Sequence, residues 1–228
     1  DGVTDDTDAI LSAIYQSEDG IVKFPRGRYR ITRTIEIRLA ETGKTGLKGE
    51  GMSATIIMEG EGPAFKFTGT HERGTANPES VSEEVWQNER MPLVTGLEIT
   101  GSNPVADGIQ LEYTMKPVIK SVLIRNVRYG IHLISRNRNV LIEGCNIYNC
   151  HKIGIFFDAV NTHQVNISGC HISYNKESGI KVARSEIRNF QITGNDIEYN
   201  YSQDTERSAD IWIDTSVEGS SVREGAIT

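Results

Sequence analysis

The chain has 228 residues, of which 37% are hydrophobic and 24% are charged, so it can bury a substantial core within one elongated domain. Its formal net charge of -7 lacks the basic excess on which nucleic-acid binding depends, and we expect no DNA or RNA partner. No apolar run approaches the length that spans a bilayer, so we expect no membrane partner either.

The N-terminal segment, residues 1–20, predicts a short amphipathic helix. Ile10, Ala13 and Ile14 fall on one helical face, and residue types that favour an N-cap occupy positions 4–6. Such a helix can cover the open end of the structure that follows it, where strand edges would otherwise stay unpaired. We therefore assign residues 1–20 as an N-terminal cap that contains a short helix.

The next segment, residues 21–67, predicts the first strands of a repeat, and residues 68–92 interrupt that repeat with a polar insertion. The insertion predicts a short helix around residues 82–88. Insertions of this kind lie on one face of a repeat protein and often form a wall of a binding groove. We expect Trp86 to hold the insertion against the domain rather than to stack on a sugar.

A 25-residue repeat dominates the remaining segment, residues 93–228. Three stretches between residues 139 and 200 share one register: NVLIEGCNIYN, QVNISGCHISYN and NFQITGNDIEYN. Equivalent positions are 25 residues apart, as in Ile142, Ile167 and Ile192. A second signature, glycine-isoleucine-any-apolar, begins at Gly108, Gly130, Gly154 and Gly179, with a variant that begins at Asp210.

The alternation of apolar and polar residues in these stretches predicts strands, and the small polar residues between them predict turns. A unit of about 25 residues cannot offset an ordering cost of roughly 1–2 kcal/mol per residue, so it must stack on its neighbours. Strands stacked at about 4.8 Å give an all-β parallel β-helix, a solenoid with columns of isoleucine inside. Leucine-rich repeats and propellers have similar periods, but their Leu-x-x-Leu-x-Leu and Trp-Asp patterns are absent.

The turns and the end of the repeat add three smaller expectations. An amide ladder is predicted for the asparagines beside the strand ends, which are Asn149, Asn175 and Asn200. Free buried thiols are predicted for the cysteines, whose spacing fits no metal site: Cys145, Cys150 and Cys170. Residues 221–227 read as the start of another rung, so we expect the native protein to continue beyond residue 228.

Three strings near the start of the chain form a specific pattern: DGVTDDTDAILSAI, IVKFPRGRYRIT and TGLKGEGMSATII. This opening, about a quarter of the chain, resembles the pectate-lyase-like superfamily of the rhamnogalacturonase and epimerase type. The resemblance implies a right-handed β-helix, a carbohydrate context, and an extracellular or periplasmic location. It does not imply one reaction, because the superfamily includes hydrolases, lyases, epimerases and phage tailspikes.

The polygalacturonases of that superfamily carry catalytic motifs that are incomplete here. Asp107 occupies the place of their first aspartate, but Arg128-Tyr129-Gly130 stands where their paired aspartates would be. A standard polygalacturonase is therefore disfavoured, and we retain Asp107 as a candidate for substrate binding.

The glycine-isoleucine signature also predicts where chemistry can occur. If its isoleucine and second apolar residue point inward, the residues between and after them form two outward columns. One column contains Gln110, His132, Phe156, Lys181 and Trp212, and the other contains Glu112, Ile134, Asp158, Ala183 and Asp214. Carboxylates two rungs apart lie roughly 9–10 Å from each other, near the separation in inverting glycosidases. The predicted catalytic residues are Asp158, Asp214 and Lys181, and the predicted substrate-binding residues are His132, Phe156, Trp212, Glu112 and Asp107.

Two reactions on a uronate-containing polysaccharide fit these residues. One is hydrolysis by the two aspartates, and the other is β-elimination with Lys181 as base and Asp158 as a ligand of Ca²⁺. No compact acidic loop supports a calcium site, so Ca²⁺ is a candidate cofactor and not a requirement. The alternative function is a non-catalytic β-helix that binds glycans or serves as a rigid spacer, as in tailspikes. An acidic polysaccharide is the expected partner, and the sequence makes no prediction of oligomeric state.

Overall fold

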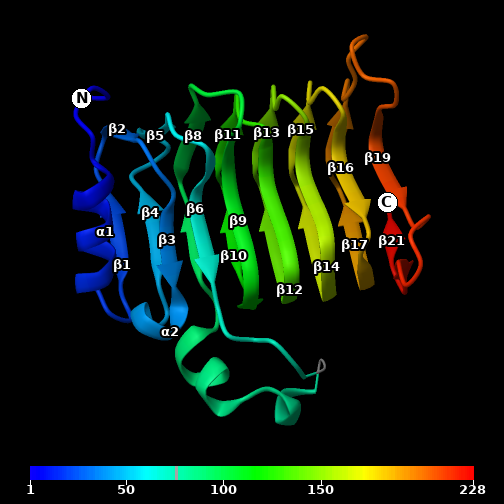
Figure 1. Cartoon of the computed structure of the whole chain (residues 1–228), viewed down its shortest axis with the longest axis horizontal. Helices are drawn as coiled ribbons and strands as arrows, with labels where there is room; N and C mark the ends of the chain where they lie inside the picture. The colour runs from blue at the N-terminus through cyan, green and yellow to red at the C-terminus, as the bar shows by residue number, and fades with distance from the viewer. Residues whose placement is uncertain (75–76) are drawn as a thin grey trace.

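The computed structural model describes residues 1–74 and 77–228, and it has the predicted architecture of a parallel β-helix. Every strand pairs in parallel with the strand one turn of the solenoid before or after it, so the rungs stack from one end of the molecule to the other (Figure 1). Helix α1 (Thr7–Gln16) lies at the N-terminal end of this stack, as the fold prediction requires.

Three sheet faces enclose the core. The first, which we call the Gly-Ile face, consists of β3 (Ile35–Arg38), β6 (Gly62–Thr68), β9 (Ala106–Met115), the first halves of β12 (Tyr129–Glu143) and β14 (Ile153–Ser168), β16 (Ser178–Ala183) and β19 (Ala209–Asp214). The second consists of β1 (Ile21–Phe24), β4 (Gly46–Gly49), β7 (Leu93–Thr95), β10 (Val118–Lys120), the second halves of β12 and β14, β17 (Glu186–Thr193), β20 (Ser221–Arg223) and β21 (Ala226–Ile227). The third consists of β2 (Gly27–Ile31), β5 (Ala54–Met58), β8 (Leu97–Gly101), β11 (Leu123–Arg125), β13 (Asn146–Tyr148), β15 (His171–Ser173) and β18 (Asp196–Glu198).

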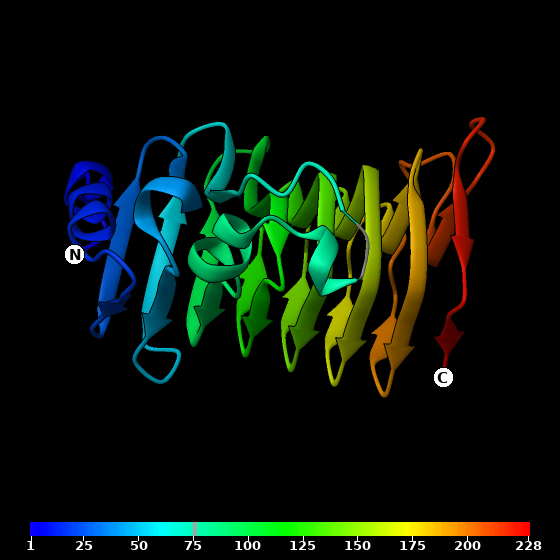
Figure 2. The ribbon, with the colours of Figure 1, turned by 90° about the horizontal axis from the view of Figure 1, so that it is seen from below.

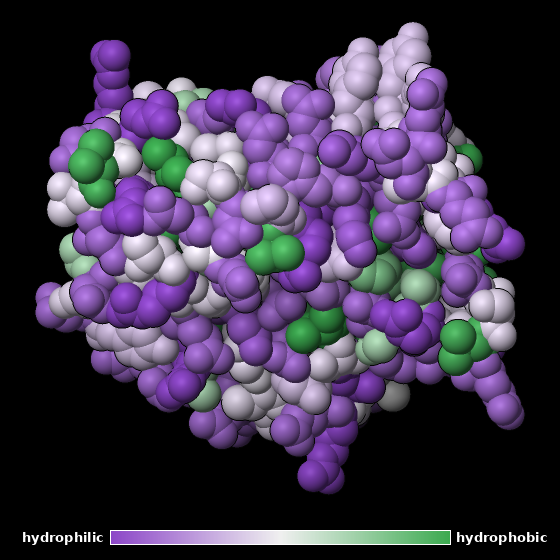
Figure 3. All heavy atoms as spheres, turned by 45° about the horizontal axis from the view of Figure 1, so that its top comes forward, coloured by the Kyte–Doolittle hydropathy of each residue, from purple (hydrophilic) through white to green (hydrophobic). Residues whose placement is uncertain are grey.

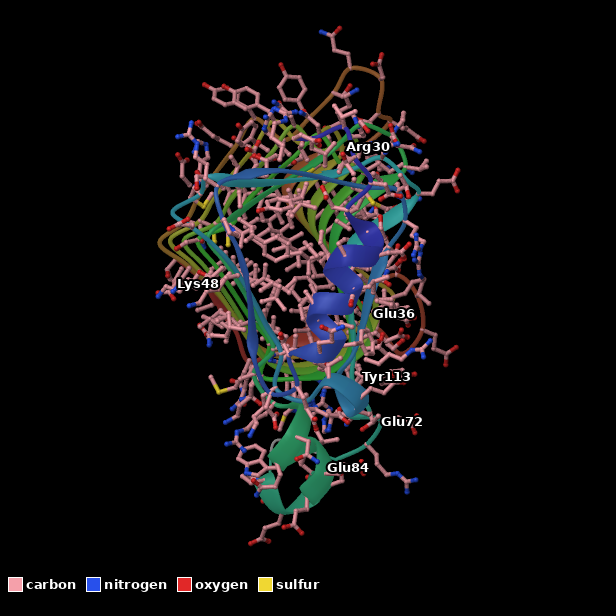
Figure 4. All side chains as sticks on the ribbon, turned by 90° about the vertical axis from the view of Figure 1, so that its left-hand side faces the viewer. Arg30, Glu36, Lys48, Glu72, Glu84 and Tyr113 are labelled. Atoms are coloured by element: carbon pink, nitrogen blue, oxygen red, sulfur yellow. The ribbon has the colours of Figure 1, made fainter. Side chains whose placement is uncertain are left out.

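The predicted isoleucine column lies in the core. Ile142, Ile167 and Ile192 are directly opposite one another in β12, β14 and β17, and each is at most 1% exposed. Seen along the solenoid axis, side chains fill the space between the faces, and Glu36 and Lys48 lie on opposite outer sides (Figure 4). The outside is mostly hydrophilic, with scattered apolar residues on the face that Figure 3 presents.

Close packing of the rungs explains why glycine begins the glycine-isoleucine signature. A Cβ added to Gly108 would lie 2.3 Å from the carbonyl oxygen of Gly130. A Cβ added to Gly130 would lie 2.5 Å from the oxygen of Gly154, and one added to Gly154 would lie 2.6 Å from that of Gly179. Only glycine lets successive rungs approach this closely, so the close packing of the rungs requires the glycine of the motif.

The predicted amide ladder exists, but one of its three members was wrong. Asn175 donates from Nδ2 to Asn200 Oδ1 at 2.8 Å, and its own Oδ1 accepts from the Cys150 amide at 3.0 Å. Cys150, not Asn149, therefore occupies the third position of the ladder. Asn149 has φ 55 and is exposed, because the left-handed turn residue that precedes the ladder position points outward.

The three cysteines are free and buried, as predicted. Burial raises the pKa of the Cys150 thiol well above its usual range. A thiol held protonated in this way is a small packing residue and not a nucleophile.

The first residue of helix α1 donates hydrogen bonds to Asp5, which lies just before the helix. The Asp5 carboxylate accepts from the Thr7 amide at 3.0 Å and from the Thr7 hydroxyl at 2.5 Å, and it also accepts from the Thr32 hydroxyl at 2.7 Å. These bonds lower the pKa of Asp5 to about 2. Asp6 occupies the N-cap position but makes no side-chain cap bond. Ile10 and Ile14 are the buried apolar residues of the helix.

The described residues between β6 and β7, 69–74 and 77–92, leave the stack and form a lobe, which lies below the strands in Figure 1 and in front of them in Figure 2. It contains a short 3₁₀ helix, η1 (Pro78–Ser80), and a π-helical turn, η2 (Val85–Glu89), close to the predicted helix. Trp86 packs with Val81, Val85 and Met115, and so holds the lobe to β9 as expected. Helix α2 (Leu39–Thr42) contacts η2. Within the described part of the chain, no helix has the length and apolar character needed to cross a bilayer.

Candidate functional site

The Gly-Ile face brings both predicted columns into register. Phe156 lies opposite His132 and Lys181 on the neighbouring rungs, and Trp212 lies opposite Lys181 on the last rung. In the second column, Ala183 lies between Asp158 and Asp214. The structure extends the two columns toward the N-terminus by residues that the sequence analysis did not include: Glu36, Lys66, Arg38 and Thr68.

His132 lies at the centre of the face, held from both sides. Its Nδ1 is 3.2 Å from Gln110 Nε2, and its Nε2 is 3.4 Å from Asp158 Oδ2. Gln110 can only donate at this contact, so Nδ1 accepts and Nε2 carries the proton that faces the carboxylate. His132 is 9% exposed, so the ring is oriented but largely covered.

Aromatic rings account for this burial. The His132 ring stacks on Phe156 with centroids 5.2 Å apart and planes at 5°. Tyr129, at the start of β12, packs against both rings with centroid distances of 5.0 and 5.2 Å. Burial raises the pKa of the Tyr129 hydroxyl. These rings form an aromatic cluster on an otherwise charged surface. Tyr129 was not identified as a site residue from the sequence, because it precedes the glycine-isoleucine signature.

Asp158 is the carboxylate that this cluster positions. Burial alone would raise its pKa, but the hydrogen bond from His132 and the charge of Arg184 together lower it. Arg184 forms an ion pair with Asp158 Oδ1. Both carboxylate oxygens therefore already face a donor, which leaves Asp158 poorly suited to hold Ca²⁺. Arg184 is the turn residue directly after β16, with φ 53, so periodicity alone did not place it on this face.

Lys181 has partners that the sequence did not predict. Its Nζ lies 2.5 Å from Glu177 Oε1 and 3.9 Å from the centroid of the Trp212 ring. The carboxylate of Glu177, the ammonium of Lys181 and the indole of Trp212 are therefore in contact, at the C-terminal edge of the face. Lys181 is therefore paired rather than free to act as a base.

The second predicted catalytic carboxylate, Asp214, accepts a hydrogen bond from the Ser216 amide at 3.0 Å. Hydrogen bonding by Ser216 lowers the pKa of Asp214, and the charge of Lys181 contributes. Asp158 and Asp214 thus both have lowered pKa values. A hydrolytic pair needs one carboxyl group with a raised pKa to act as the acid, so the two aspartates do not have the asymmetry of such a pair.

The remaining predicted binding residues lie further toward the N-terminus. Asp107 is 1% exposed and accepts from Arg128 Nε at 2.9 Å, from Arg128 Nη2 at 2.7 Å and from the Tyr129 amide at 3.1 Å. This burial gives Asp107 a role in holding the turn between rungs, and no surface for a substrate. Glu112 pairs with Lys66 Nζ at 2.9 Å and accepts from the Ser135 hydroxyl at 2.8 Å. Burial alone would raise the pKa of Glu112, but these contacts with Lys66 and Ser135 lower it.

Among the described residues, one group of side chains has the spacing of metal ligands: His171, Asp196 and Glu198, whose ligand atoms lie within 4.8 Å of one another. They lie on β15 and β18 of the third face. The Gly-Ile face and this group therefore belong to different sides of the solenoid.

Comparisons with known proteins agree with this fold. The family model described as right handed beta helix region matches residues 85–225, and the model described as Rhamnogalacturonase A/epimerase, pectate lyase-like matches residues 1–71. The first description also agrees with the predicted handedness. No curated protein matches the chain.

Three solved structures are similar over most of the chain. ORF18 of Geobacillus virus E2 is 19% identical over 86% of this chain, with a TM-score of 0.49. The A-module of the Azotobacter vinelandii mannuronan C-5 epimerase AlgE4 is 16% identical over 93% of this chain and 71% of its own, with a TM-score of 0.46. The catalytic unit of a GH87 alpha-1,3-glucanase from Streptomyces thermodiastaticus is 13% identical over 93% of this chain and 44% of its own, with a TM-score of 0.48. The chain spans about half the length of the viral structure, 53%. Identities this low carry no information on activity.

Proposed function

The chain belongs to the right-handed β-helix family, and from that premise we propose that it acts on a uronate-containing polysaccharide that lies along the Gly-Ile face. The substrate class is supported by the match of residues 1–71 to the rhamnogalacturonase, epimerase and pectate-lyase-like model. The same proposal places the protein outside the cytoplasm, where such polymers occur.

One arrangement carries the proposal. Asp158, Lys181 and Trp212 lie on three successive rungs, and each is in contact with a partner of complementary character. An indole face binds the apolar face of a sugar ring, and paired charges beside it can exchange their partners for hydroxyl or carboxylate groups of the substrate. This combination suits an acidic glycan better than it suits a neutral or apolar ligand.

Of the two reactions, the geometry favours β-elimination over hydrolysis. Asp158 and Asp214 both have lowered pKa values, so neither is held protonated as a hydrolytic acid. Elimination needs a cation beside the uronate carboxylate and a base that takes the proton from the neighbouring carbon. The face offers Arg184 as the cation and Lys181 as the base, and Lys181 must first lose its own proton and its contact with Glu177. Arg184 is 53% exposed at its side chain, so a substrate carboxylate can reach it.

A second candidate function is glycan binding without cleavage. It is favoured by His132, because both ring nitrogens are engaged and the ring is nearly buried. A base that must meet substrate needs at least one free, accessible nitrogen or oxygen.

The deciding experiment incubates the protein with polygalacturonate, alginate and a neutral glucan. Absorbance of unsaturated uronates reports elimination, reducing ends without that absorbance report hydrolysis, and a binding isotherm without either product reports binding alone. Asp158→Asn and Trp212→Ala are expected to lower the observed activity or affinity at least about tenfold. The same substitution at the exposed loop residue Asp204, Asp204→Asn, serves as the control. Equal loss in the control, or no interaction with any uronate polymer, would contradict the proposal.

A further inference from the structure

A second line of charge runs along the solenoid, separate from the columns of the Gly-Ile face. Arg138, His163 and Arg188 occupy equivalent positions on β12, β14 and β17, and Arg223 continues the line on β20. We call these four residues the basic column. Because rungs are spaced by about 4.8 Å, the column places basic side chains at regular intervals along the axis.

The N-terminal end of the basic column is buried beneath the lobe. Arg138 is 2% exposed, and it donates to the carbonyl oxygens of Asn137 at 2.8 Å and Asn161 at 3.1 Å. Gly74 of the lobe accepts from both Arg136 and Arg138. Burial, reinforced by the charge of Arg136, lowers the pKa of Arg138 to about 10.

His71 of the lobe adds to this concentration of basic groups. It is 1% exposed, and burial together with the charges of Arg138 and Arg136 lowers its pKa to about 4. The pKa of His163 is lowered as well, by burial and then by Arg138 and Arg188. Neighbouring arginines thus disfavour the protonation of His71, Arg138 and His163, as expected where cations outnumber anions.

Within the described residues, one carboxylate offsets these charges. Glu186 is the acidic residue that acts on Arg136, Arg138 and His163. Its Oε1 is shared by Arg188 at 3.2 Å and Arg223 at 3.6 Å, and its Oε2 accepts from Asn161 Nδ2 at 2.7 Å. Four arginines therefore share a single negative charge.

Unsatisfied donors gather at the same place. Seven buried side-chain polar atoms in the described chain have no hydrogen-bond partner, and four of them belong to these residues: the Nε atoms of Arg136, Arg138 and Arg188, and Nε2 of His71. A buried donor without an acceptor costs free energy, on the order of 1–3 kcal/mol. Three of the four atoms lie beneath the lobe, where a ligand at the surface does not reach them, so they mark a local excess of positive charge. An anion bound at the open end of the column would offset that excess.

We propose that the basic column is a second binding site, which takes the carboxylate groups of an acidic glycan. Guanidinium groups bind such oxyanions through paired hydrogen bonds, and a bound anion would relieve the repulsion between stacked cations. The column opens toward the C-terminal rungs, where the side chains of Arg188 and Arg223 are 36% and 52% exposed. A polymer that carries one carboxylate per sugar can meet successive cations there. The identity of the ligand rests on the proposed function, but the existence of an anion site does not.

The test compares oligogalacturonate with the same oligomer after reduction of its carboxyl groups to alcohols, by isothermal titration. The double variant Arg188→Gln/Arg223→Gln is expected to weaken oligogalacturonate binding at least about tenfold and to leave binding of the reduced oligomer unchanged. Arg33→Gln, an equally exposed arginine near the N-terminal end, is the matched control. A thermal melt checks that the double variant folds, which is expected because both arginines are partly exposed.

A second arm uses inorganic sulfate as the probe, at constant ionic strength. Sulfate is expected to raise the melting temperature of the wild type more than that of the double variant. If oligogalacturonate binding falls in Asp158→Asn and Trp212→Ala but not in the double variant, the basic column is not a glycan site and the proposed function stands. If the wild type binds no uronate but sulfate stabilisation depends on Arg188 and Arg223, the anion site stands and the proposed function fails. If the double variant matches the wild type in both arms, the inference is wrong.

Discussion

His132 Nε2 lies 3.4 Å from Asp158 Oδ2, although the two residues belong to different columns on neighbouring rungs. The contact is diagonal, so the histidine spans the space between the columns and orients the carboxylate. Gln110 on the other ring nitrogen completes a chain of three polar side chains across three rungs. The most specific polar geometry of the Gly-Ile face therefore depends on a pairing that runs across the repeat.

Replacing this histidine by phenylalanine tests that geometry. His132→Phe keeps an aromatic ring for Phe156 to stack on, but it removes the hydrogen bond that helps to lower the pKa of Asp158. We expect the pKa of Asp158 to rise, as followed by carboxyl-carbon NMR, and the free energy of unfolding to change by less than about 1.5 kcal/mol. Uronate turnover or binding should fall about tenfold. An unchanged Asp158 pKa would show that the contact has no electrostatic role.

Glu177→Gln tests the partner of Lys181. The substitution removes a negative charge 2.5 Å from the ammonium but keeps the side-chain shape. We expect affinity for an anionic glycan to increase about two- to fivefold, which corresponds to the worth of one partly exposed ion pair. Titration with oligogalacturonate measures the change. Glu218→Gln, in an exposed loop, should leave the affinity as it is; an equal gain there would mean that only net charge matters.

Gly130→Ala tests the packing of rungs. The new Cβ would lie 2.5 Å from the oxygen of Gly154 and 2.7 Å from a methyl group of Ile147, so the rungs must separate. We expect a loss of about 1–3 kcal/mol in the free energy of unfolding, measured by urea denaturation. Gly27→Ala is the control, because its nearest contact would be an ordinary 3.5 Å from Tyr29. Similar losses in the two variants would contradict the packing explanation.

Asn175→Ala tests the amide ladder. The residue is fully buried, and replacing its side chain leaves the Cys150 amide without its partner. It also removes one of the two donors to Asn200 Oδ1, the other being the backbone amide of residue 175. We expect a loss of about 2–3 kcal/mol in the free energy of unfolding, because buried polar groups become unsatisfied. Asn149→Gly, one turn residue away from the ladder, should be nearly neutral since glycine accepts its φ of 55. A large loss at Asn149 would restore it to the ladder.

The buried His71 predicts how stability depends on pH. Its folded pKa is about 4 and its unfolded pKa is about 6.5, so the unfolded chain binds the proton more tightly. The contribution of His71 to the free energy of unfolding is therefore fully present above about pH 6.5. It is lost as the pH falls toward 4, and the loss is on the order of 3 kcal/mol at most. His71→Leu should remove this slope from urea melts collected between pH 7 and 4, whereas His171→Leu on the exposed third face should retain it. A slope that persists in His71→Leu would assign it to other groups.

Much of the molecule could be predicted from the repeat. A 25-residue period determines which residues stack on successive rungs, so the core position of Ile142, Ile167 and Ile192 followed from counting. The alignment of His132 with Phe156, which are 24 residues apart, followed from superimposing the glycine-isoleucine signatures. The prediction of Asn149 departed from this count, because the residue 25 positions before Asn175 is Cys150, and Asn149 is the left-handed turn residue just before it. An error of one residue exchanges inside for outside, since neighbouring side chains point to opposite faces.

By itself, the sequence determined the rung period, the parallel stacking, the inward isoleucines and the two outward columns, because these depend only on spacing and on the burial of apolar side chains. The tertiary structure alone decided which charges meet: Asp158 with Arg184, Lys181 with Glu177, and Asp107 with Arg128. It also decided that the lobe covers Arg138. Long side chains reach across columns and turns, and where they reach depends on rotamers and on close neighbours in space, neither of which a linear repeat contains.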